Sequence, residues 1–331
     1  MKRLVDQIRR AQSILLSTHR QCDGDGLGAE LALFHAMKAA EMEVRIINVD
    51  MTPKKYRFLN PDRWIQYFDS DSKLPEQVDL TLIFDTNDER LLTPLYPSLK
   101  KISKTLAFVD HHPVLARGPV PTKDSWIDVT SASTGEMSYR LIKELGLPIN
   151  REVARALYTS ITFDTQLYRF VRNSPMSHRI AAEMMEHGID TEEIHRHLFG
   201  NQTVQKMAFL ARALGQIEYF CDGKLAILRL NDADLFHYNL EPDDSRDVID
   251  MLMNIESLEA AALFREDSTD EYKISLRSKG KIEVLSVAEN LGGGGHVHAA
   301  GAFVKGTFET LKEQVVQELT SLLERVPPSR K

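Results

Sequence analysis

Residues 13–39 read SILLSTHRQCDGDGLGAELALFHAMKA: a short apolar run, a loop rich in glycine and acidic residues, and a helix-forming segment. Further apolar runs at Val44–Val49, Leu80–Phe84 and Thr105–Val109 alternate with amphipathic segments. Short buried runs that alternate with helical patterns are typical of α/β proteins with a mostly parallel sheet flanked by helices. In such sheets ligands bind beyond the carboxyl ends of the strands, so we expect function in the residues after each run.

The length of 331 residues favours two domains, because single cores rarely grow so large. Residues 133–197 are mainly helical, and a helix over Val204–Leu214 precedes a hairpin-like pair, residues 216–220 and 221–230. Strands are expected at Leu258–Arg265 and Glu271–Arg277. We therefore predict a smaller second α/β domain with antiparallel strands. The expected boundaries are a first domain over 1–190, a helical linker over 191–214, a second domain over 215–326 and a disordered tail over 327–331.

Composition narrows the class of protein. The formal charge of −7 argues against a protein that grips long nucleic acid, since such proteins usually carry a basic face. Two cysteines, Cys22 and Cys221, cannot form a disulfide framework, and the N-terminus has no signal-peptide pattern. No apolar run approaches the ~18 residues of a membrane span. These features predict a soluble cytoplasmic protein with no membrane partner.

Acidic and histidine side chains follow the predicted strands. His19, Asp23 and Asp25 crowd the first loop, and Asp85 follows the Leu80–Phe84 run. A rival interpretation treats GDGLG as a phosphate-binding glycine loop, with Asp50 as a ribose-binding acid. The G-x-G-x-G spacing and the two loop carboxylates disfavour that interpretation. The remaining members of this set come from later segments: Asp110, His111, His112 and Asp164.

Divalent metals would explain why the four carboxylates Asp23, Asp25, Asp85 and Asp164 are placed together. Without cations these groups would repel one another and raise each other's pKa values. Two divalent ions balance four carboxylates and leave His19 and His111 as neutral nitrogen ligands. Such mixed ligation suits Mn²⁺ better than Mg²⁺, and zinc and cobalt stay open.

The order of these motifs resembles that of the DHH phosphoesterase superfamily, with Asp110-His111-His112 as the DHH triplet. Residues 292–304, GGGGHVHAAGAFV, resemble the glycine-rich motif of the DHH-associated C-terminal domain, and residues 273–280, KISLRSKG, resemble the strand before it. Size and domain order are similar to the family of nanoRNases and phosphatases of 3′-phosphoadenosine 5′-phosphate (pAp). The likeness covers essentially the whole chain and implies an active site in the cleft between the two domains.

The resemblance also implies roles for individual residues. One metal would be held by His19, Asp23 and Asp85, and the other by Asp25, Asp85, His111 and Asp164, with Asp85 as a bridge. His112 would lie beside the scissile phosphate as electrophile or proton donor, with Asp110 as its partner. The chain departs from the family pattern at Cys22, Ala29 and Gln166, where proline, serine and glycine are common. None of these departures removes a ligand, but they leave the loop shape and the substrate preference open.

The second domain offers candidates for substrate binding. Lys273, Ser275, Arg277, Lys279 and Lys281 alternate with other residues, so a strand would place them on one face. The glycine run 292–295 would expose backbone N–H groups as an anion-binding nest. The residues predicted to bind substrate are Ser275, Arg277, Gly294, Gly295 and His296.

The leading hypothesis is a manganese-dependent two-metal phosphoesterase that hydrolyses short RNA to mononucleotides, removes the 3′-phosphate of pAp, or does both. Alternatives are a phosphodiesterase for linear products of cyclic dinucleotides (pGpG or pApA), a polyphosphate-type phosphatase, and a nucleotide-binding regulator with a dead site. A long-strand exonuclease of the RecJ type is disfavoured by length and charge. The direction of attack and a homodimeric state are left open.

Overall fold

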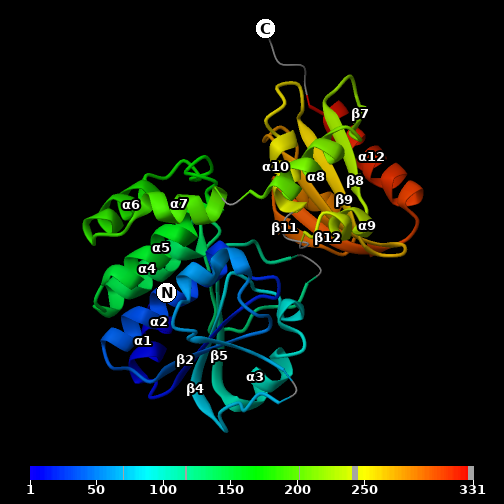
Figure 1. Cartoon of the computed structure of the whole chain (residues 1–331). Helices are drawn as coiled ribbons and strands as arrows, with labels where there is room; N and C mark the ends of the chain where they lie inside the picture. Colours follow the sequence, from blue (N-terminus) through cyan, green and yellow to red (C-terminus); the bar gives the residue numbers. More distant parts are fainter. Residues whose placement is uncertain (70, 116–117, 201, 241–244, 327–331) are drawn as a thin grey trace. The chain divides into compact units, whose positions relative to one another are not determined.

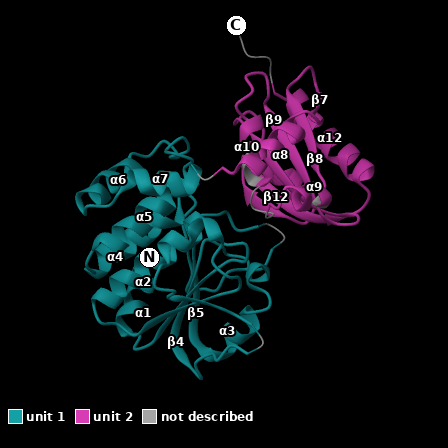
Figure 2. Cartoon of the chain, viewed as in Figure 1, with its two compact units in different colours: residues 1–201 teal, residues 202–331 magenta. Residues whose placement is uncertain are grey.

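The computed structural model describes residues 1–69, 71–115, 118–200, 202–240 and 245–326 (Figure 1). The chain divides into two compact units, residues 1–201 and 202–331 (Figure 2). The boundary between the units falls within the segment 191–214, for which a linker is predicted from the sequence. The predicted tail, residues 327–331, lies outside the described residues.

Unit 1 is built on a six-stranded parallel sheet in the order β3-β2-β1-β4-β5-β6. The prediction of a mostly parallel sheet is confirmed. The strands span β1 Ile14–Thr18, β2 Val44–Asn48, β3 Ile65–Tyr67, β4 Val78–Phe84, β5 Ser103–Asp110 and β6 Trp126–Ile127. The helices span α1 Lys2–Arg10, α2 Gly24–Ala39, α3 Tyr96–Ile102, α4 Thr134–Leu145, α5 Arg151–Asp164, α6 Met176–Glu186 and α7 Thr191–Phe199, with 3₁₀ turns η1 Lys54–Leu59 and η2 Glu89–Leu92.

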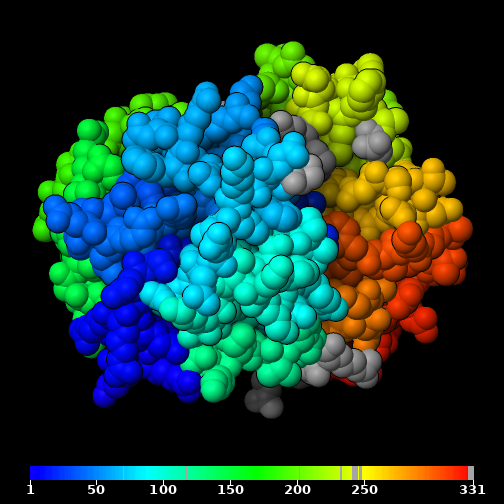
Figure 3. Space-filling view, turned by 90° about the horizontal axis from the view of Figure 1, so that it is seen from below, coloured from blue at the N-terminus to red at the C-terminus, as the bar shows by residue number. Residues whose placement is uncertain are grey.

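Helices cover both faces of this sheet because its strands are apolar on both sides. Ile14 and Leu16 contribute to the larger core, which also contains residues of α1, α2, α4 and α5. Leu15 points the other way, into a smaller core under α3. Figure 1 shows α3 on the opposite side of the strands from α2. In Figure 3 the surface formed by the part of unit 1 around β3 to β5 is light blue and cyan.

Helix α2 is buried almost all round, which explains its many small residues. It begins after Asp23, whose side chain accepts a hydrogen bond from the Asp25 N–H. A Cβ on Gly26 would lie 2.3 Å from Thr18 Oγ1, and a Cβ on Gly28 would lie 2.7 Å from the Ala156 carbonyl oxygen. Glycine at these positions lets α2 approach β1 and α5 closely, so the loop at its N-terminus is held against the sheet.

Unit 2 contains a six-stranded sheet in the order β11-β12-β10-β9-β8-β7. Strands β8 and β9 are parallel and all other pairs are antiparallel, so the prediction of antiparallel strands holds except at this one pair. The strands span β7 Glu218–Phe220, β8 Leu225–Leu230, β9 Ala260–Ser268, β10 Glu271–Ser278, β11 Gly294–His296 and β12 Ala299–Lys305. The helices span α8 Val204–Leu214, α9 Asp232–His237, α10 Arg246–Leu252, α11 Leu285–Asn290 and α12 Phe308–Glu324.

Two sequence predictions in unit 2 are wrong. Strand β10 ends at Ser278 and Gly280 has a φ of 106°, so Lys279 and Lys281 do not continue the alternation; their ammonium groups bind the Ile255 carbonyl and Glu259. The glycine run also does not expose all of its N–H groups as predicted. The N–H groups of Gly292 and Gly293 donate to carbonyl groups of α11, and residues 294–296 form β11.

No helix in the described ranges is long and apolar enough to cross a membrane.

Candidate metal centre

The carboxyl ends of β1, β4 and β5 carry the first ligands. These three strands are neighbours in the sheet, so the residues that follow them share one edge. His19 follows β1, Asp85 follows β4, and His111 follows β5. Asp85 adopts a left-handed backbone conformation, with φ 61°, while its N–H donates to the Val109 carbonyl at 3.0 Å. Aspartate tolerates this conformation better than most residues, and the bond ties the end of β4 to β5.

Helices supply the remaining acids. Asp23 and Asp25 lie at the N-terminus of α2, directly after the β1 loop, and Asp164 is the last residue of α5. Helix α5 packs along α2, which brings its C-terminal end to the same edge of the sheet.

Six predicted ligands meet in two groups. Donor atoms of His19, Asp23 and Asp85 lie within 4.8 Å of one another, and so do those of Asp25, His111 and Asp164. His19 Nε2 is 3.4 Å from Asp85 Oδ2, and His111 Nε2 is 3.7 Å from Asp85 Oδ1. The two oxygens of Asp85 therefore face different histidines, which is the arrangement of a carboxylate between two ions.

The donor spacing fits divalent metals. His111 Nε2 lies 3.5 Å from Asp25 Oδ2 and 3.5 Å from Asp164 Oδ2. Ligands that are each about 2.0–2.2 Å from a shared ion lie roughly 3.0–3.6 Å from one another. Imidazole nitrogen with several carboxylate oxygens is a donor set that suits Mn²⁺, Co²⁺ or Zn²⁺.

Burial makes these acids costly to ionise without a cation. Burial, followed by the charges of neighbouring aspartates, raises the pKa of Asp85 and of Asp164 well above their usual range. Burial also raises the pKa of Asp25 to about 6. Burial, reinforced by His112, lowers the pKa of His111 to about 3, so this imidazole is neutral and can offer a nitrogen to a metal.

Three residues that the sequence analysis did not identify hold Asp25. The N–H groups of Thr134 and Gly135 donate to its two oxygens at 2.8 and 3.2 Å, and the Ser160 hydroxyl donates to Oδ1. The Thr134 hydroxyl also donates to Asp85 Oδ1 at 3.1 Å. The signal available in the sequence was the capping box Ser133-Thr-Gly-Glu136, which starts α4 and aims its first N–H groups at the site.

His112 lies beside the second group and is held by Asp110. His112 Nδ1 is 2.8 Å from Asp110 Oδ1 and 3.6 Å from Asp85 Oδ1. Burial lowers the pKa of His112, but the charges of Asp110 and Asp85 outweigh it and raise this pKa to about 9. Asn87, a further residue missed from the sequence, donates to Asp110 Oδ2 at 2.6 Å and to the His112 carbonyl at 3.1 Å. The contacts with Asp110 and Asn87 therefore fix the His112 ring beside Asp85, and its raised pKa favours the protonated form.

The five predicted substrate-binding residues gather around β12 in unit 2. Arg277 and His296 pair with Ala299 from opposite sides, and Ser275 and Gly294 pair in the same way with Gly301. Directly paired residues of antiparallel strands point to the same face. Gly295 pairs with Ala300, which lies between these two positions, so it belongs to the opposite face of the sheet. Arg277 Nε is 3.3 Å from Asp250 Oδ1 on α10.

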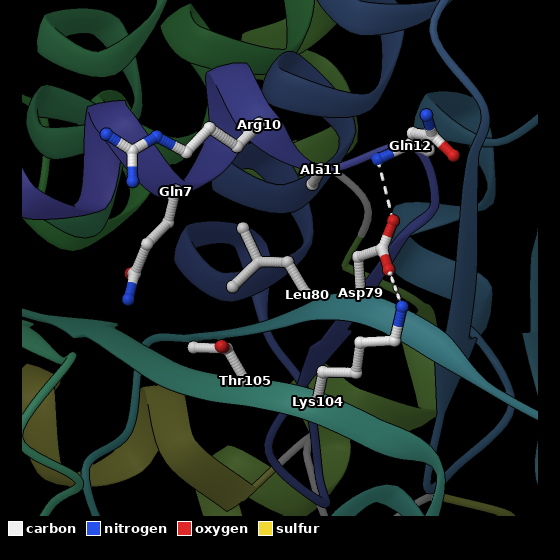
Figure 4. Close-up of a pocket in the computed structure, with 8 residues that line it drawn as sticks. All are labelled: Gln7, Arg10, Ala11, Gln12, Asp79, Leu80, Lys104 and Thr105. Atoms are coloured by element: carbon white, nitrogen blue, oxygen red, sulfur yellow. Dashed lines mark hydrogen bonds and ion pairs between the residues drawn. The ribbon is translucent and has the colours of Figure 1, made fainter.

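A pocket at the amino ends of the strands in the unit 1 sheet is lined by none of the predicted site residues. Its volume is about 390 Å³. The Asp79 carboxylate in it accepts bonds from the Gln12 N–H at 2.8 Å and from Lys104 Nζ at 2.7 Å. Its charge is thus already compensated. The lining residues, drawn in Figure 4, are Gln7, Arg10, Ala11, Gln12, Asp79, Leu80, Lys104 and Thr105.

Comparison with known proteins identifies the family of the chain. Residues 13–161 match the model of the DHH family, N-terminal domain. The chain belongs to the DHH phosphoesterase superfamily. Residues 222–326 of this DHH protein match the DHHA1 domain, so both parts of the resemblance seen in the sequence are confirmed.

Relatives of this DHH protein match over nearly its full length. A bifunctional oligoribonuclease and PAP phosphatase, NrnA, from Thermus thermophilus is 29% identical, covering 96% of this chain and 94% of the relative. The protein with the same description from Bacillus subtilis is 25% identical, covering 96% and 97%. The crystal structure of an exopolyphosphatase-related protein from Bacteroides fragilis shares the fold, with a TM-score of 0.86, 24% identity and coverage of 97% and 96%.

Proposed function

We propose that this DHH phosphoesterase uses two divalent ions, Mn²⁺ in preference to Mg²⁺ or Co²⁺, to hydrolyse short oligoribonucleotides and the 3′-phosphate of pAp. The observation that carries the proposal is the position of Asp85, whose two oxygens face His19 and His111, 3.4 and 3.7 Å away. The substrates follow from the relatives described as bifunctional oligoribonucleases and PAP phosphatases. A cytoplasmic location stays a prediction.

The proposed ligands of the two ions correspond to the two groups of donor atoms described above, with Asp85 added to the second group. His19, Asp23 and Asp85 would hold one ion, and Asp25, Asp85, His111 and Asp164 the other. Bound ions of this kind lower the pKa of a shared water and neutralise charge on the phosphate.

The residues around the ions prepare the site. Thr134, Gly135 and Ser160 orient Asp25 so that one of its oxygens faces His111. Protonated His112, held by Asp110, would donate a hydrogen bond or a proton to an oxygen of the scissile phosphoester.

In unit 2, Ser275, Arg277, Gly294, Gly295 and His296 would bind the substrate away from the ions. Arg277 would leave Asp250 for a phosphate oxygen, since both partners are only partly buried.

A hydrolysis panel tests the proposal. Purified protein with Mn²⁺, Mg²⁺ or Co²⁺ would be offered pAp, pGpG, dinucleotides, five-mers and twenty-mers of RNA. We expect turnover of pAp and of the short RNAs, and little turnover of twenty-mers. Hydrolysis that is independent of added metal after chelation, or that favours twenty-mers, would contradict the proposal.

A further inference from the structure

The unit 2 sheet has one face that is covered over only half of its strands. Ala226, Leu228, Ala261 and Leu263 on β8 and β9 lie in a core with residues of α8 and α10. On β10 the same face carries Lys273, Ser275 and Arg277, all partly exposed, while the alternate residues are buried in the core on the other side. In the part of the chain that the structure describes, this face therefore becomes accessible from β10 outward.

An aromatic residue lies on this accessible face next to a lysine. Phe303 pairs directly with Lys273 across β12 and β10, as Ala299 pairs with Arg277. The Lys273 ammonium lies 5.3 Å from the centre of the Phe303 ring, yet Phe303 remains 51% exposed. On β10 and β12, Ser275 and Gly301 lie between the two ends of the face. The face thus has a cation at each end, a flat floor and an aromatic ring at the end distant from Arg277.

Charge and shape favour a nucleotide on this face. An aromatic ring offers a stacking surface to any base, and a nearby cation pairs with the phosphate that accompanies it. Three acids near this face, all among the described residues, are engaged in ion pairs: Asp267 binds Arg265, Asp250 binds Arg277, and Glu271 binds Lys305. An anionic ligand would therefore meet the ammonium group of Lys273 and would compete with Asp250 for Arg277.

Distance separates the ring from the residues already assigned. Lys273 and Phe303 lie four residues along their strands from Arg277 and Ala299, or about 13 Å. That exceeds the separation of phosphate and base within one nucleotide. A base on Phe303 would thus belong to the nucleotide next to the one whose phosphate Arg277 holds.

We propose that Phe303, with Lys273, forms a stacking subsite for the second base of a short oligoribonucleotide. This inference rests on the proposed function and adds a determinant of substrate length: a ligand with two bases gains the stacking contact, whereas pAp, with one base, does not.

The test compares KM values of the full-length protein for a dinucleotide and for pAp. Phe303→Ala should raise the dinucleotide KM about tenfold and leave the pAp KM within about twofold, since only the ligand with two bases stacks on the ring. Phe303→Trp should restore the dinucleotide KM. Tyr219→Ala is the matched control, because Tyr219 is 52% exposed on β7, at the opposite edge of the same sheet, and should change neither KM.

A binding assay keeps the subsite testable apart from hydrolysis. The fluorescence of a dinucleotide with a 2-aminopurine base should be quenched when the dinucleotide binds the Asp85→Ala variant. This quench should be lost in the double variant Asp85→Ala/Phe303→Ala. Equal KM changes for both substrates, an unaltered quench, or a change in oligomeric state caused by Phe303→Ala would overturn the subsite. Absence of any hydrolysis by the unsubstituted protein, with the quench intact, would instead refute only the proposed function.

Discussion

The candidate metal centre of unit 1 consists of buried charged groups, whereas the accessible face of unit 2 carries partly exposed ones. Asp25, Asp85 and His111 are 1%, 6% and 0% exposed. Asp25 and Asp85 accept hydrogen bonds from Thr134, and His111 Nδ1 bonds to the Ser131 carbonyl oxygen. Arg277 and Lys273 lie on a partly exposed strand face, where their side chains can exchange partners. Rigid burial suits groups that must hold ions at fixed spacing, whereas exposed cations on a flat strand suit a ligand of variable length.

The largest loss of hydrolysis is expected when the carboxylate shared by the two groups of proposed ligands is removed. Asp85→Ala deletes the group between His19 and His111, so we expect hydrolysis of pAp and of short RNA to fall by roughly 1,000-fold or more. Steady-state turnover and bound metal per protein measure the effect. Asp88→Ala is the control, since Asp88 lies in the same loop but binds Arg90. Retention of both metals and of activity in Asp85→Ala would refute the bridging role.

A milder change loosens the centre without removing a ligand. Thr134→Val deletes the hydroxyl that donates to Asp85 at 3.1 Å and keeps the N–H that donates to Asp25. Loss of a group that orients a ligand typically costs 10–100-fold in metal affinity, so we expect a drop of about that size in calorimetric titration with Mn²⁺.

Thr134→Ser should restore most of the affinity. Thr130→Val, in the exposed part of the same loop, should leave it unaltered. An unchanged affinity in Thr134→Val would show that the backbone bonds alone suffice.

On the accessible face the expected effect lies in binding rather than in turnover. Arg277→Ala should raise KM for short oligonucleotides about tenfold, because a hydrogen bond to a charged group contributes ~1.5–3 kcal/mol. KM for a small phosphoester such as p-nitrophenyl phosphate should stay the same. Lys305→Ala is the control, because Lys305 pairs with Glu271 at the far end of β10. Equal changes for both substrates would argue against a role of Arg277 in binding.

The smallest effect on activity is expected for Glu30, a buried acid that binds no predicted ligand. Its Oε1 accepts from Asn48 Nδ2 at 2.6 Å, and burial raises its pKa to about 8. A carboxyl group whose pKa is higher in the folded than in the unfolded chain favours folding while it is protonated. Its contribution is therefore lost as pH rises from about 4.5 to about 8.

Glu30→Gln keeps the acceptor and removes the titration. Relative to the unsubstituted protein, the free energy of unfolding of the variant should rise by on the order of 2–4 kcal/mol between pH 5 and pH 8. Urea unfolding of the metal-free proteins at several pH values measures this, and Glu41→Gln, at an exposed position after α2, is the control. A pH-independent difference would contradict the raised pKa of Glu30.

Sequence patterns predicted that the proposed ligands would lie close together, because parallel strands carry the loops after them to one edge of the sheet. His19, Asp85 and His111 could be assigned from strand ends alone. The contacts of Thr134 and Ser160 with Asp25 could not, since they arise where α4 and α5 pack against α2, far apart in the chain.

The errors in unit 2 have similar causes. The glycine run 292–295 was expected to expose its backbone N–H groups, but those of Gly292 and Gly293 bond to α11, and residues 294–296 pair with β12. Such bonds are not visible in a local pattern. The alternating pattern of basic residues was predicted to continue through Lys279 and Lys281, but the strand ends at Ser278 because Gly280 turns the chain just after β10. Local periodicity thus predicted the elements better than their ends.

The dispersal of the ligands along unit 1 has a consequence for biosynthesis. His19 comes from the first strand and Asp164 from the last turn of α5, so a growing chain on the ribosome holds no complete set of donors until α5 has emerged. Capture of both ions would then be possible only after α5 has been made, while α6 and α7 of the same unit are still to follow.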